Sequence, residues 1–465
     1  MTMRTERDAL GEIEVPSEAL YGAQTARAIT NFAISGYRMP RSLIEALATI
    51  KSVAAEVGAV DGSLPEPRAQ RIMQAADEVA RGDHDEQMLV DVFQTGSGTS
   101  WNMNVNEVIA RRATLLGDAT EVPIHPNDEV NRCQSSNDVV PAAIRLAARD
   151  QLRRQVVPAC DRLHDALAAQ AQRHRRTVKI GRTHLMDAMP VTYGQVFDQW
   201  CERVANARQQ FLHAAEGLQP LPLGGTAVGS GVNAPADFGR RCGELLGQRY
   251  AMPVTAAPRP GTLQAGSDGP LACSAAMRQC ALVVLRLADD IRWLASGPRH
   301  GLGEIDLPAR QPGSSIMPDK VNPVTEEAVI QVGLQVVAHD QAIAQGSCFG
   351  SFELHLMQPL IAHNLLEGLR LLSQATGRLA VDSIAVLAID PERLRAGLAD
   401  HPILATALAV HIGHEQAVDL ARQARETGRS IIDLAEAATD LGRERLCQIL
   451  DPLRLADRAA EWVGR

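Results

Sequence analysis

The chain has 465 residues, which is enough for a large core and more than one domain. Its formal net charge of -9 argues against a surface built to bind nucleic acid or an acidic membrane. Hydrophobic residues make up 45% of the chain but aromatic residues only 3%, and this composition favours packed helices over β-sandwiches.

Cysteine usage and the N-terminus bear on where the protein works. The eight cysteines are scattered without a C-x-x-C pair, so we expect reduced thiols rather than a zinc site. Residues 1–8 are charged and lack the apolar core of a signal peptide. No apolar run approaches the roughly 18 residues of a membrane span. We therefore expect a cytoplasmic protein with neither a membrane nor a nucleic-acid partner.

The first third of the chain shows short helical patterns between irregular stretches. Residues 1–40 contain turn signals and are predicted to form an irregular arm. Helical periodicity follows at 41–57, 67–80 and 103–116. Residues 117–137 are predicted to be irregular.

Long helical patterns dominate the middle of the chain. The first starts at Asp138, a plausible N-cap with Pro141 in the first turn, and Pro158 is expected to kink or split it before it ends at Arg173. Four further long patterns cover residues 192–216, 270–294, 325–345 and 358–386. Helices of this length without internal caps predict a helical bundle, and Asp390 with Pro391 marks the start of a small helical C-terminal part.

Two segments are rich in donors suited to bind an anion. Residues 95–104 contain glycines that let backbone N–H groups approach an anion, and Ser97 and Thr99 add hydroxyl donors. The second segment is formed by residues 125–128 and 134–138, where Ser-Ser-Asn again precedes a helix. The alternative for both is ordinary helix capping, because Ser, Asn and Asp are the favoured caps.

Two later segments add acid–base and cationic groups. In residues 181–184, His184 can serve as a general acid or base near neutral pH, although a lone histidine is often structural. Residues 313–323 combine small residues, hydroxyls, Lys320 and an amide, so that Lys320 can neutralise a carboxylate as charge accumulates on it. Glu327 could orient a histidine, or it could be a solvated carboxylate on a helix face.

These segments resemble, in order and spacing, those of the fumarase/aspartase superfamily, whose members add or remove water or an amine across the double bond of fumarate. The likeness covers nearly the whole chain and includes residues 4–8, 20–25 and 224–229. It implies a mainly α chain with a long central helical bundle, divided into an N-terminal domain, a bundle domain and a small helical C-terminal domain. The expected boundaries are 1–137, 138–389 and 390–465.

The resemblance also implies an oligomer and a reaction. The family packs its long helices into a homotetramer, with each active site assembled from three subunits. Residues 93–99 and 134–138 are most similar to class II fumarases, which hydrate fumarate reversibly to L-malate through an aci-carboxylate intermediate. One alternative is aspartate ammonia-lyase, or a lyase that releases fumarate from an N-substituted aspartate. A second alternative is a non-catalytic scaffold descendant.

Residue roles are carried over from the family position by position. Ser314 would be the catalytic base, with Lys320 lowering its pKa, and His184, held by Glu327, would handle the proton of the departing hydroxyl. The expected substrate-binding residues are Ser97, Gly98, Thr99, Ser135, Ser136, Asn137, Thr183, Ser315, Val321 and Asn322. A second, peripheral dicarboxylate site would use His125, Pro126, Asn127 and Asp128. The family requires no metal or organic cofactor.

Three positions depart from the family pattern near the inferred site. Asp319 stands where glycine is usual and could pair with Lys320, repel a dicarboxylate or receive an ammonium group. Trp101 replaces a small residue and would either reshape the pocket or face a neighbouring helix. His355 stands where the family usually has asparagine.

Overall fold

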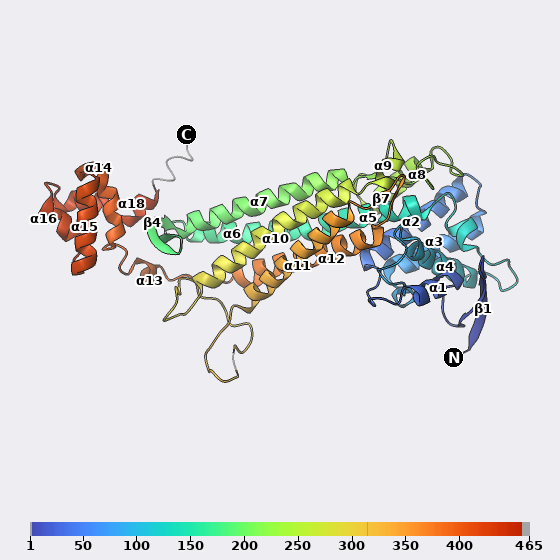
Figure 1. Cartoon of the computed structure of the whole chain (residues 1–465), viewed down its shortest axis with the longest axis horizontal. Helices are drawn as coiled ribbons and strands as arrows, with labels where there is room; N and C mark the ends of the chain where they lie inside the picture. Colours follow the sequence, from blue (N-terminus) through green and yellow to red (C-terminus); the bar gives the residue numbers. More distant parts are fainter. Residues whose placement is uncertain (1, 314, 458–465) are drawn as a thin grey trace. The chain divides into compact units, whose positions relative to one another are not determined.

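The computed structural model of the chain describes residues 2–313 and 315–457. These residues form eighteen α-helices and four two-stranded sheets, and Figure 1 follows them in chain order. The prediction of a mainly α fold is therefore confirmed. The division into three domains at residues 137 and 389 stays a prediction.

The four longest helices match the long patterns of the sequence. They are α7 (Tyr193–Gly217), α10 (Asp268–Leu294), α11 (Val324–Gly346) and α12 (Gln358–Arg378). In α10 the residues at helical spacing, such as Met277, Ala281 and Ala288, are fully buried. An apolar stripe of this kind holds a helix in a bundle because it must be covered by other elements.

Helix α10 is also long and apolar enough to cross a membrane by length and composition. This differs from the expectation that no segment reaches that length. Arg278, Arg286 and Arg292 interrupt the apolar run, yet one 18-residue window keeps a mean hydropathy of 1.5, and 56% of that window is buried within the chain. Buried core helices of soluble proteins pass the same test.

The pattern that begins at Asp138 forms two helices, α5 (Ser136–Gln151) and α6 (Val157–Arg173). The prediction that Asp138 is the N-cap is wrong, because Ser135 caps α5 and Asp138 is the third residue of the helix, with Pro141 inside it. A π-helical segment, Leu152–Val156, separates the two helices immediately before Pro158. Since proline cannot donate the hydrogen bond of a regular turn, the interruption at this point agrees with the expected kink.

The N-terminal arm is more ordered than predicted. Strands β1 (Met3–Asp8) and β2 (Gly11–Pro16) form an antiparallel hairpin, and α1 (Ala23–Asn31) follows it. The charged residues of β1 hide the apolar alternation by which a half-buried strand is normally recognised. The prediction of an irregular arm over residues 1–40 is therefore wrong for most of its length.

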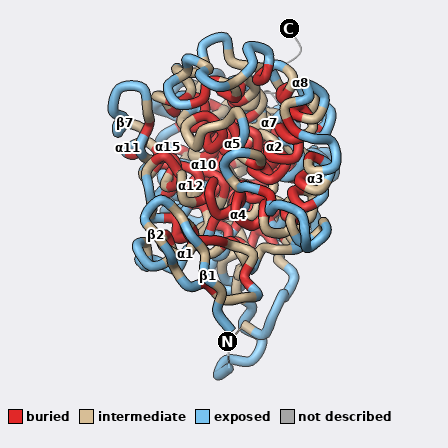
Figure 2. Tube along the Cα trace, turned by 90° about the vertical axis from the view of Figure 1, so that its right-hand side faces the viewer, coloured by how far each residue is buried: buried red, intermediate tan, exposed pale blue. Residues whose placement is uncertain are grey.

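The helices α2 (Arg41–Val60), α3 (Glu66–Arg81) and α4 (Thr99–Leu115) follow the predicted patterns closely. Fourteen of the twenty residues of α2 are buried, and Figure 2 shows the buried stretches of α2, α4 and α5 inside a rim of exposed loops. The interior of this part of the chain is thus built on α2, α4 and α5.

The remaining elements are mostly short. The hairpin strands are β3 (Val178–Thr183) and β4 (Met186–Thr192). The others are η1 (Asp85–Gln87), η2 (Pro126–Val130), β5 (Pro220–Leu221), α8 (Phe238–Tyr250), β6 (Thr255–Ala256), α9 (Pro260–Ala265), β7 (Gly350–Ser351), β8 (Leu354–His355), η4 (Leu379–Ile384), α13 (Pro391–Arg395), η5 (Pro402–Leu408), α14 (Ala409–Ile412), α15 (His414–Thr427), α16 (Ile431–Ala438), α17 (Arg443–Ile449) and α18 (Pro452–Asp457).

The chain divides into two compact units. The first comprises residues 1–158, 207–282 and 332–374, and the second comprises residues 159–206, 283–331 and 375–465. Within the second unit, the helices after residue 400 have an apolar core of their own, which includes Leu404, Leu420 and Ile431.

Candidate active site

The first anion-binding segment leads into α4. Gly98 is the N-cap residue and has a φ of +76°, a left-handed conformation that suits glycine. A Cβ on Gly98 would also lie 2.9 Å from a methyl group of Val140 in α5. The loop therefore lies close against α5, and within it the hydroxyl oxygens of Ser97 and Thr99 are 2.7 Å apart.

The second segment meets the first at the start of α5. The hydroxyl oxygens of Thr99 and Ser136 are 2.8 Å apart, although these residues are 37 positions apart in the sequence. Ser135 caps α5 and forms a capping box with Asp138. The two helices therefore begin side by side, and their N-termini present backbone N–H groups and hydroxyls, the combination that favours an anion.

A third segment supports α5 from residues 224–229. The buried carboxylate of Asp138 accepts hydrogen bonds from the backbone N–H groups of Ser135 and Thr226, each at 2.9 Å. The side-chain amide of Asn137 donates to the carbonyl oxygen of Ala227 at 2.9 Å. Burial raises the pKa of Asp138, and these backbone donors oppose that rise. Asp138 thus completes the capping box from the third position of the helix and is not itself the N-cap.

His184 lies at the tip of the β3–β4 hairpin. Thr183 pairs with Met186, so His184 and Leu185 form a two-residue turn, and their φ values are +54° and +61°. Type I′ hairpin turns need positive φ at both positions, which usually selects glycine or asparagine. A histidine held in this sparsely populated conformation at an exposed tip points to a functional role for the turn.

A buried cluster anchors this hairpin, and the sequence reasoning missed it. The carboxylate of Glu304 accepts hydrogen bonds from the Tyr193 hydroxyl and the Lys179 ammonium, each at 2.8 Å, and from the Arg182 guanidinium. Burial by itself raises the pKa of Glu304, but Lys179, Tyr193 and Arg182 bring it below its usual value. The signal was present as Lys179 and Arg182 flanking Gly181, but their partner is more than 120 residues away.

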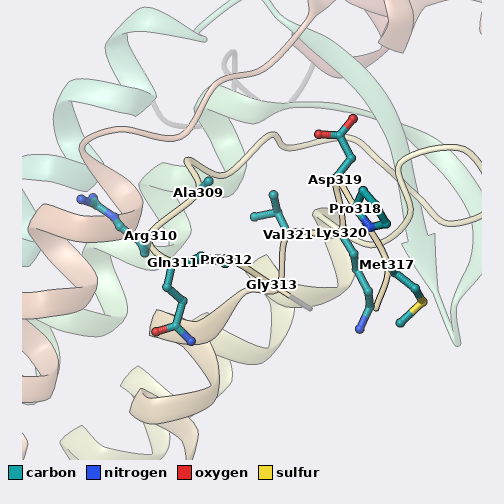
Figure 3. A pocket seen from close by; sticks show the side chains of 10 residues that line it. All are labelled: Ala309, Arg310, Gln311, Pro312, Gly313, Met317, Pro318, Asp319, Lys320 and Val321. Carbon is teal, nitrogen blue, oxygen red and sulfur yellow. The ribbon is translucent and has the colours of Figure 1, made fainter. Parts of the chain in front are cut away.

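Residues 315–321 are exposed, and a cavity of about 430 Å³ is lined by residues 309–313 and 317–321 (Figure 3). The side-chain amide of Asn322 donates to the carbonyl oxygen of Gly313 at 2.8 Å and closes the base of the loop. A Cβ on Gly313 would lie 1.7 Å from the carbonyl oxygen of Lys320, so this closure requires glycine.

The charged residues of this loop point in different directions. In Figure 3 the carboxylate of Asp319 and the ammonium group of Lys320 point away from each other, and neither has a partner among the described residues. Asp319 has a φ of +69°, in the left-handed region. The pairing between Asp319 and Lys320 that the sequence left open is absent from this conformation of the loop.

The other predicted residues of the second unit are exposed or lie outside the described part. Ser314, the predicted base, lies outside the described residues. Ser315, Val321, Thr183 and Glu327 are exposed. Within the described part of this single chain, no hydrogen bond joins His184 to Glu327, and their pairing stays a prediction.

The predicted peripheral site begins at an exposed turn. His125 Nδ1 accepts a hydrogen bond from the Asp128 backbone N–H at 3.1 Å and lies 3.1 Å from the Asp128 carboxylate. Pro126 and Asn127 belong to the same turn, η2. The nearby Arg68 is paired with Glu129, so it is not a free cation for an added dicarboxylate. Binding at this site stays a prediction.

The structure therefore brings some predicted residues together and leaves others apart. Ser97, Gly98, Thr99, Ser135, Ser136 and Asn137 meet within the first unit. Thr183, His184, Ser315, Lys320, Val321, Asn322 and Glu327 belong to the second unit. The joining of the two groups into one site stays a prediction. No cluster of three or more metal-ligating side chains occurs among the residues that the structure describes.

The chain is similar to known protein families and to individual proteins over most of its length. Residues 11–338 match the family described as Lyase, and residues 404–457 match the family described as Fumarase C C-terminus. The class II fumarate hydratase of Mycobacterium tuberculosis (strain ATCC 25618 / H37Rv) is 45% identical over 97% of this chain and 96% of its own length. That of Xylella fastidiosa (strain 9a5c) is 44% identical over 99% of this chain and 97% of its own length.

Solved structures give the same likeness. The class II fumarase of Schistosoma mansoni superposes with a TM-score of 0.94 at 33% identity, covering 98% of this chain and 99% of that one. A fumarate lyase/delta crystallin from Brucella melitensis, bound to cobalt, superposes with a TM-score of 0.92 at 39% identity over 98% of this chain and all of that one.

Proposed function

The chain belongs to the fumarase/aspartase superfamily, in its class II fumarate hydratase branch, and from this premise we propose that it catalyses the reversible hydration of fumarate to L-malate. The observation that carries the proposal is the 2.8 Å approach of the Thr99 and Ser136 hydroxyls at two adjacent helix N-termini. A carboxylate bound there meets hydroxyl donors, backbone N–H groups and the positive ends of two helix dipoles.

The two carboxylates of the substrate need donors on both sides. Thr99, Ser136 and their neighbours Ser97, Ser135 and Asn137 hold the first carboxylate, with Gly98 allowing the close approach. Thr183, at the end of β3, is one of the donors for the second carboxylate. Since a dicarboxylate is a dianion and the chain has a net charge of -9, its binding depends on such local donors.

In the chemical step, Ser314 is the base that removes the proton from the carbon next to one carboxylate of malate. An unassisted serine is too weak a base, so Lys320 and backbone donors of the loop must lower its pKa. Removal of the proton leaves a doubly charged aci-carboxylate intermediate. Lys320 and Asn322, with the loop residues Ser315 and Val321, stabilise this charge, and most of the rate enhancement comes from that stabilisation.

The departing hydroxyl needs a proton, and His184 supplies it through water. The hairpin turn that holds His184, anchored through Glu304, supports this role because it places His184 at an exposed tip. Glu327 orients His184 and stabilises its charged form. The exposed positions of both residues in the single chain agree with a site that is completed by other subunits.

We further propose a homotetramer with active sites shared between subunits and a cytoplasmic location. The exposed apolar side chains of Ile316, Met317 and Val321 in the loop agree with burial against another subunit. The eight scattered cysteines without a C-x-x-C pair agree with a reducing compartment. The turn at His125, Pro126, Asn127 and Asp128 is proposed as a second dicarboxylate site.

The test is the ultraviolet absorbance of the fumarate double bond, measured with purified protein and L-malate or L-aspartate in parallel. We expect fumarate to form from malate alone. Ser314→Ala should lower the rate of this reaction by orders of magnitude while the oligomer stays intact. Signal with aspartate alone would replace the proposal by an ammonia-lyase. If neither substrate gives fumarate, the proposal is overturned in favour of a bulkier succinyl substrate or a non-catalytic descendant.

A further inference from the structure

A lysine without any exposed surface lies beneath the paired helix N-termini. Lys51, in α2, is 0% exposed, and its ammonium group donates to Asn131 Oδ1 at 2.8 Å and to Gln134 Oε1 at 2.9 Å. Burial of a lysine that has only neutral partners is costly. Such a residue is retained when its charge or its hydrogen bonds serve the site around it.

The hydrogen bonds of Lys51 reach both anion-binding segments. Gln134 directly precedes Ser135, the cap of α5. Asn131 Oδ1 also accepts a hydrogen bond from the side-chain amide of Asn102 at 3.1 Å, and Asn102 lies in the first turn of α4. A single amide oxygen thus connects Lys51 to the starts of α4 and α5, the two helices whose hydroxyls meet.

The charge of Lys51 is only partly balanced within the chain. Among the described residues, its ammonium group donates hydrogen bonds to neutral amides, and Asp138 acts on it through a longer-range attraction. Burial lowers the pKa of Lys51 to about 7, and the charge of Asp138 opposes this effect, so a neighbouring dianion would favour the ammonium form of Lys51. Asp138 itself is engaged by the backbone of Ser135 and Thr226. A dianion at the adjacent helix N-termini would supply further negative charge.

We propose that Lys51 is a positioning residue for the dicarboxylate substrate, fixing the turns into α4 and α5 and placing a buried positive charge behind the hydroxyls of Thr99 and Ser136. It therefore controls the affinity for the dianion rather than the chemical step, since it does not touch the reacting atoms. This inference rests on the proposed function.

The first experiment replaces Lys51 by methionine, which keeps the length of the side chain and removes the charge. For Lys51→Met we expect the KM for L-malate and the dissociation constant of succinate, a non-reacting dicarboxylate, to rise together by about tenfold, with kcat within about threefold. Ser52→Ala is the matched control. It removes a partly buried hydrogen bond that Arg249 donates to the next residue of the same helix, away from the network, and should leave both constants unchanged.

A second variant covers the case in which Lys51→Met fails to fold. Gln134→Glu pairs a carboxylate with the ammonium group, so the cation stays buried but is neutralised. We expect a similar loss of succinate affinity, measured by calorimetry, in a protein that still unfolds cooperatively. Wild-type affinity for succinate in a folded Lys51→Met or Gln134→Glu protein would overturn the inference.

The binding measurement separates this inference from the proposed function. If the wild-type chain binds succinate but does not convert malate, the proposed function fails, and the effect of Lys51→Met on binding still decides the inference. If Lys51→Met lowers kcat and leaves succinate binding intact, the inference fails while the hydratase activity stands. A wild-type chain that neither binds succinate nor converts malate would overturn both.

Discussion

Gly96 precedes the first anion-binding residues and touches main chain from a distant segment. A Cβ at this position would lie 2.0 Å from the carbonyl oxygen of Leu356 and 2.8 Å from its carbonyl carbon. The carbonyl oxygen of Gly96 also accepts a hydrogen bond from the backbone N–H of Gln358 at 3.0 Å. Because both sides of the contact are backbone, Gly96→Ala cannot be accommodated by the rotation of a side chain.

The size of the expected effect follows from these distances. Ordinary contact with a Cβ begins at 3.4 Å, so the loop must move by roughly 1.4 Å, the difference from the 2.0 Å in the structure. Overpacking of this kind costs about 1–3 kcal/mol of stability. The same movement displaces Ser97 and Thr99, and a misplacement of about 1 Å in a substrate-positioning group lowers kcat/KM by about 100-fold.

The assay compares fumarate formation from malate and urea unfolding for the wild type, Gly96→Ala and a control. Gly217→Ala is the matched control, because nothing lies within 4 Å of its Cβ and its φ is not positive. We expect the control to keep its activity and to be as stable as the wild type or slightly more so. A Gly96→Ala protein with wild-type kcat/KM would refute the reasoning that this backbone contact places the anion-binding loop.

The three residues that depart from the family pattern, Trp101, Asp319 and His355, give further predictions. Trp101→Ser should cost about 3–5 kcal/mol in urea unfolding and should not raise activity, because the indole is fully buried and donates to the Val90 carbonyl oxygen at 3.2 Å; an unchanged unfolding midpoint would contradict this. Asp319→Gly removes a charge beside Lys320 and relieves a φ of +69°, so kcat/KM for malate should rise about fivefold, which corresponds to about 1 kcal/mol; no change would mean that Asp319 is tolerated variation. Burial lowers the pKa of His355 below its usual 6.5, so the unfolded chain takes up the proton first and stability falls as the pH drops below 6.5. Unfolding of His355→Asn at pH 7.5 and pH 5.5 should show a smaller loss than the wild type, and an equal loss would exclude His355 as a source of this dependence.

The long helices could be predicted because their apolar residues recur without interruption. Patterns at 192–216 and 270–294 became α7 and α10 with ends shifted by one or two residues. The N-terminal hairpin could not be found in this way, since Arg4, Glu6 and Asp8 alternate with other polar residues and leave no apolar face. Apolar periodicity arises because one face of an element is buried, so a strand that buries little apolar surface shows no such periodicity.

The segments of the candidate site could be recognised, but their supports could not. Ser-Ser-Asn before a helix is visible in the sequence, whereas the cap assignment failed because both Ser135 and Asp138 are good caps and only the backbone geometry distinguishes them. Lys51 and Glu304 gave no local signal, because their partners lie about 80 or more residues away along the chain. Buried polar networks of this kind depend on tertiary contacts, which a single sequence does not contain.

The departures from the family pattern can now be separated by where they lie. Trp101 follows Thr99 by two positions on α4, and residues two apart on a helix point about 200° apart, so the indole faces the interior when the Thr99 hydroxyl faces the site. His355 is buried, and its Nδ1 accepts a hydrogen bond from the backbone of Met357. Only Asp319 lines the loop cavity together with Lys320. Of these three departures, Asp319 is therefore the one placed to change the substrate preference of the loop.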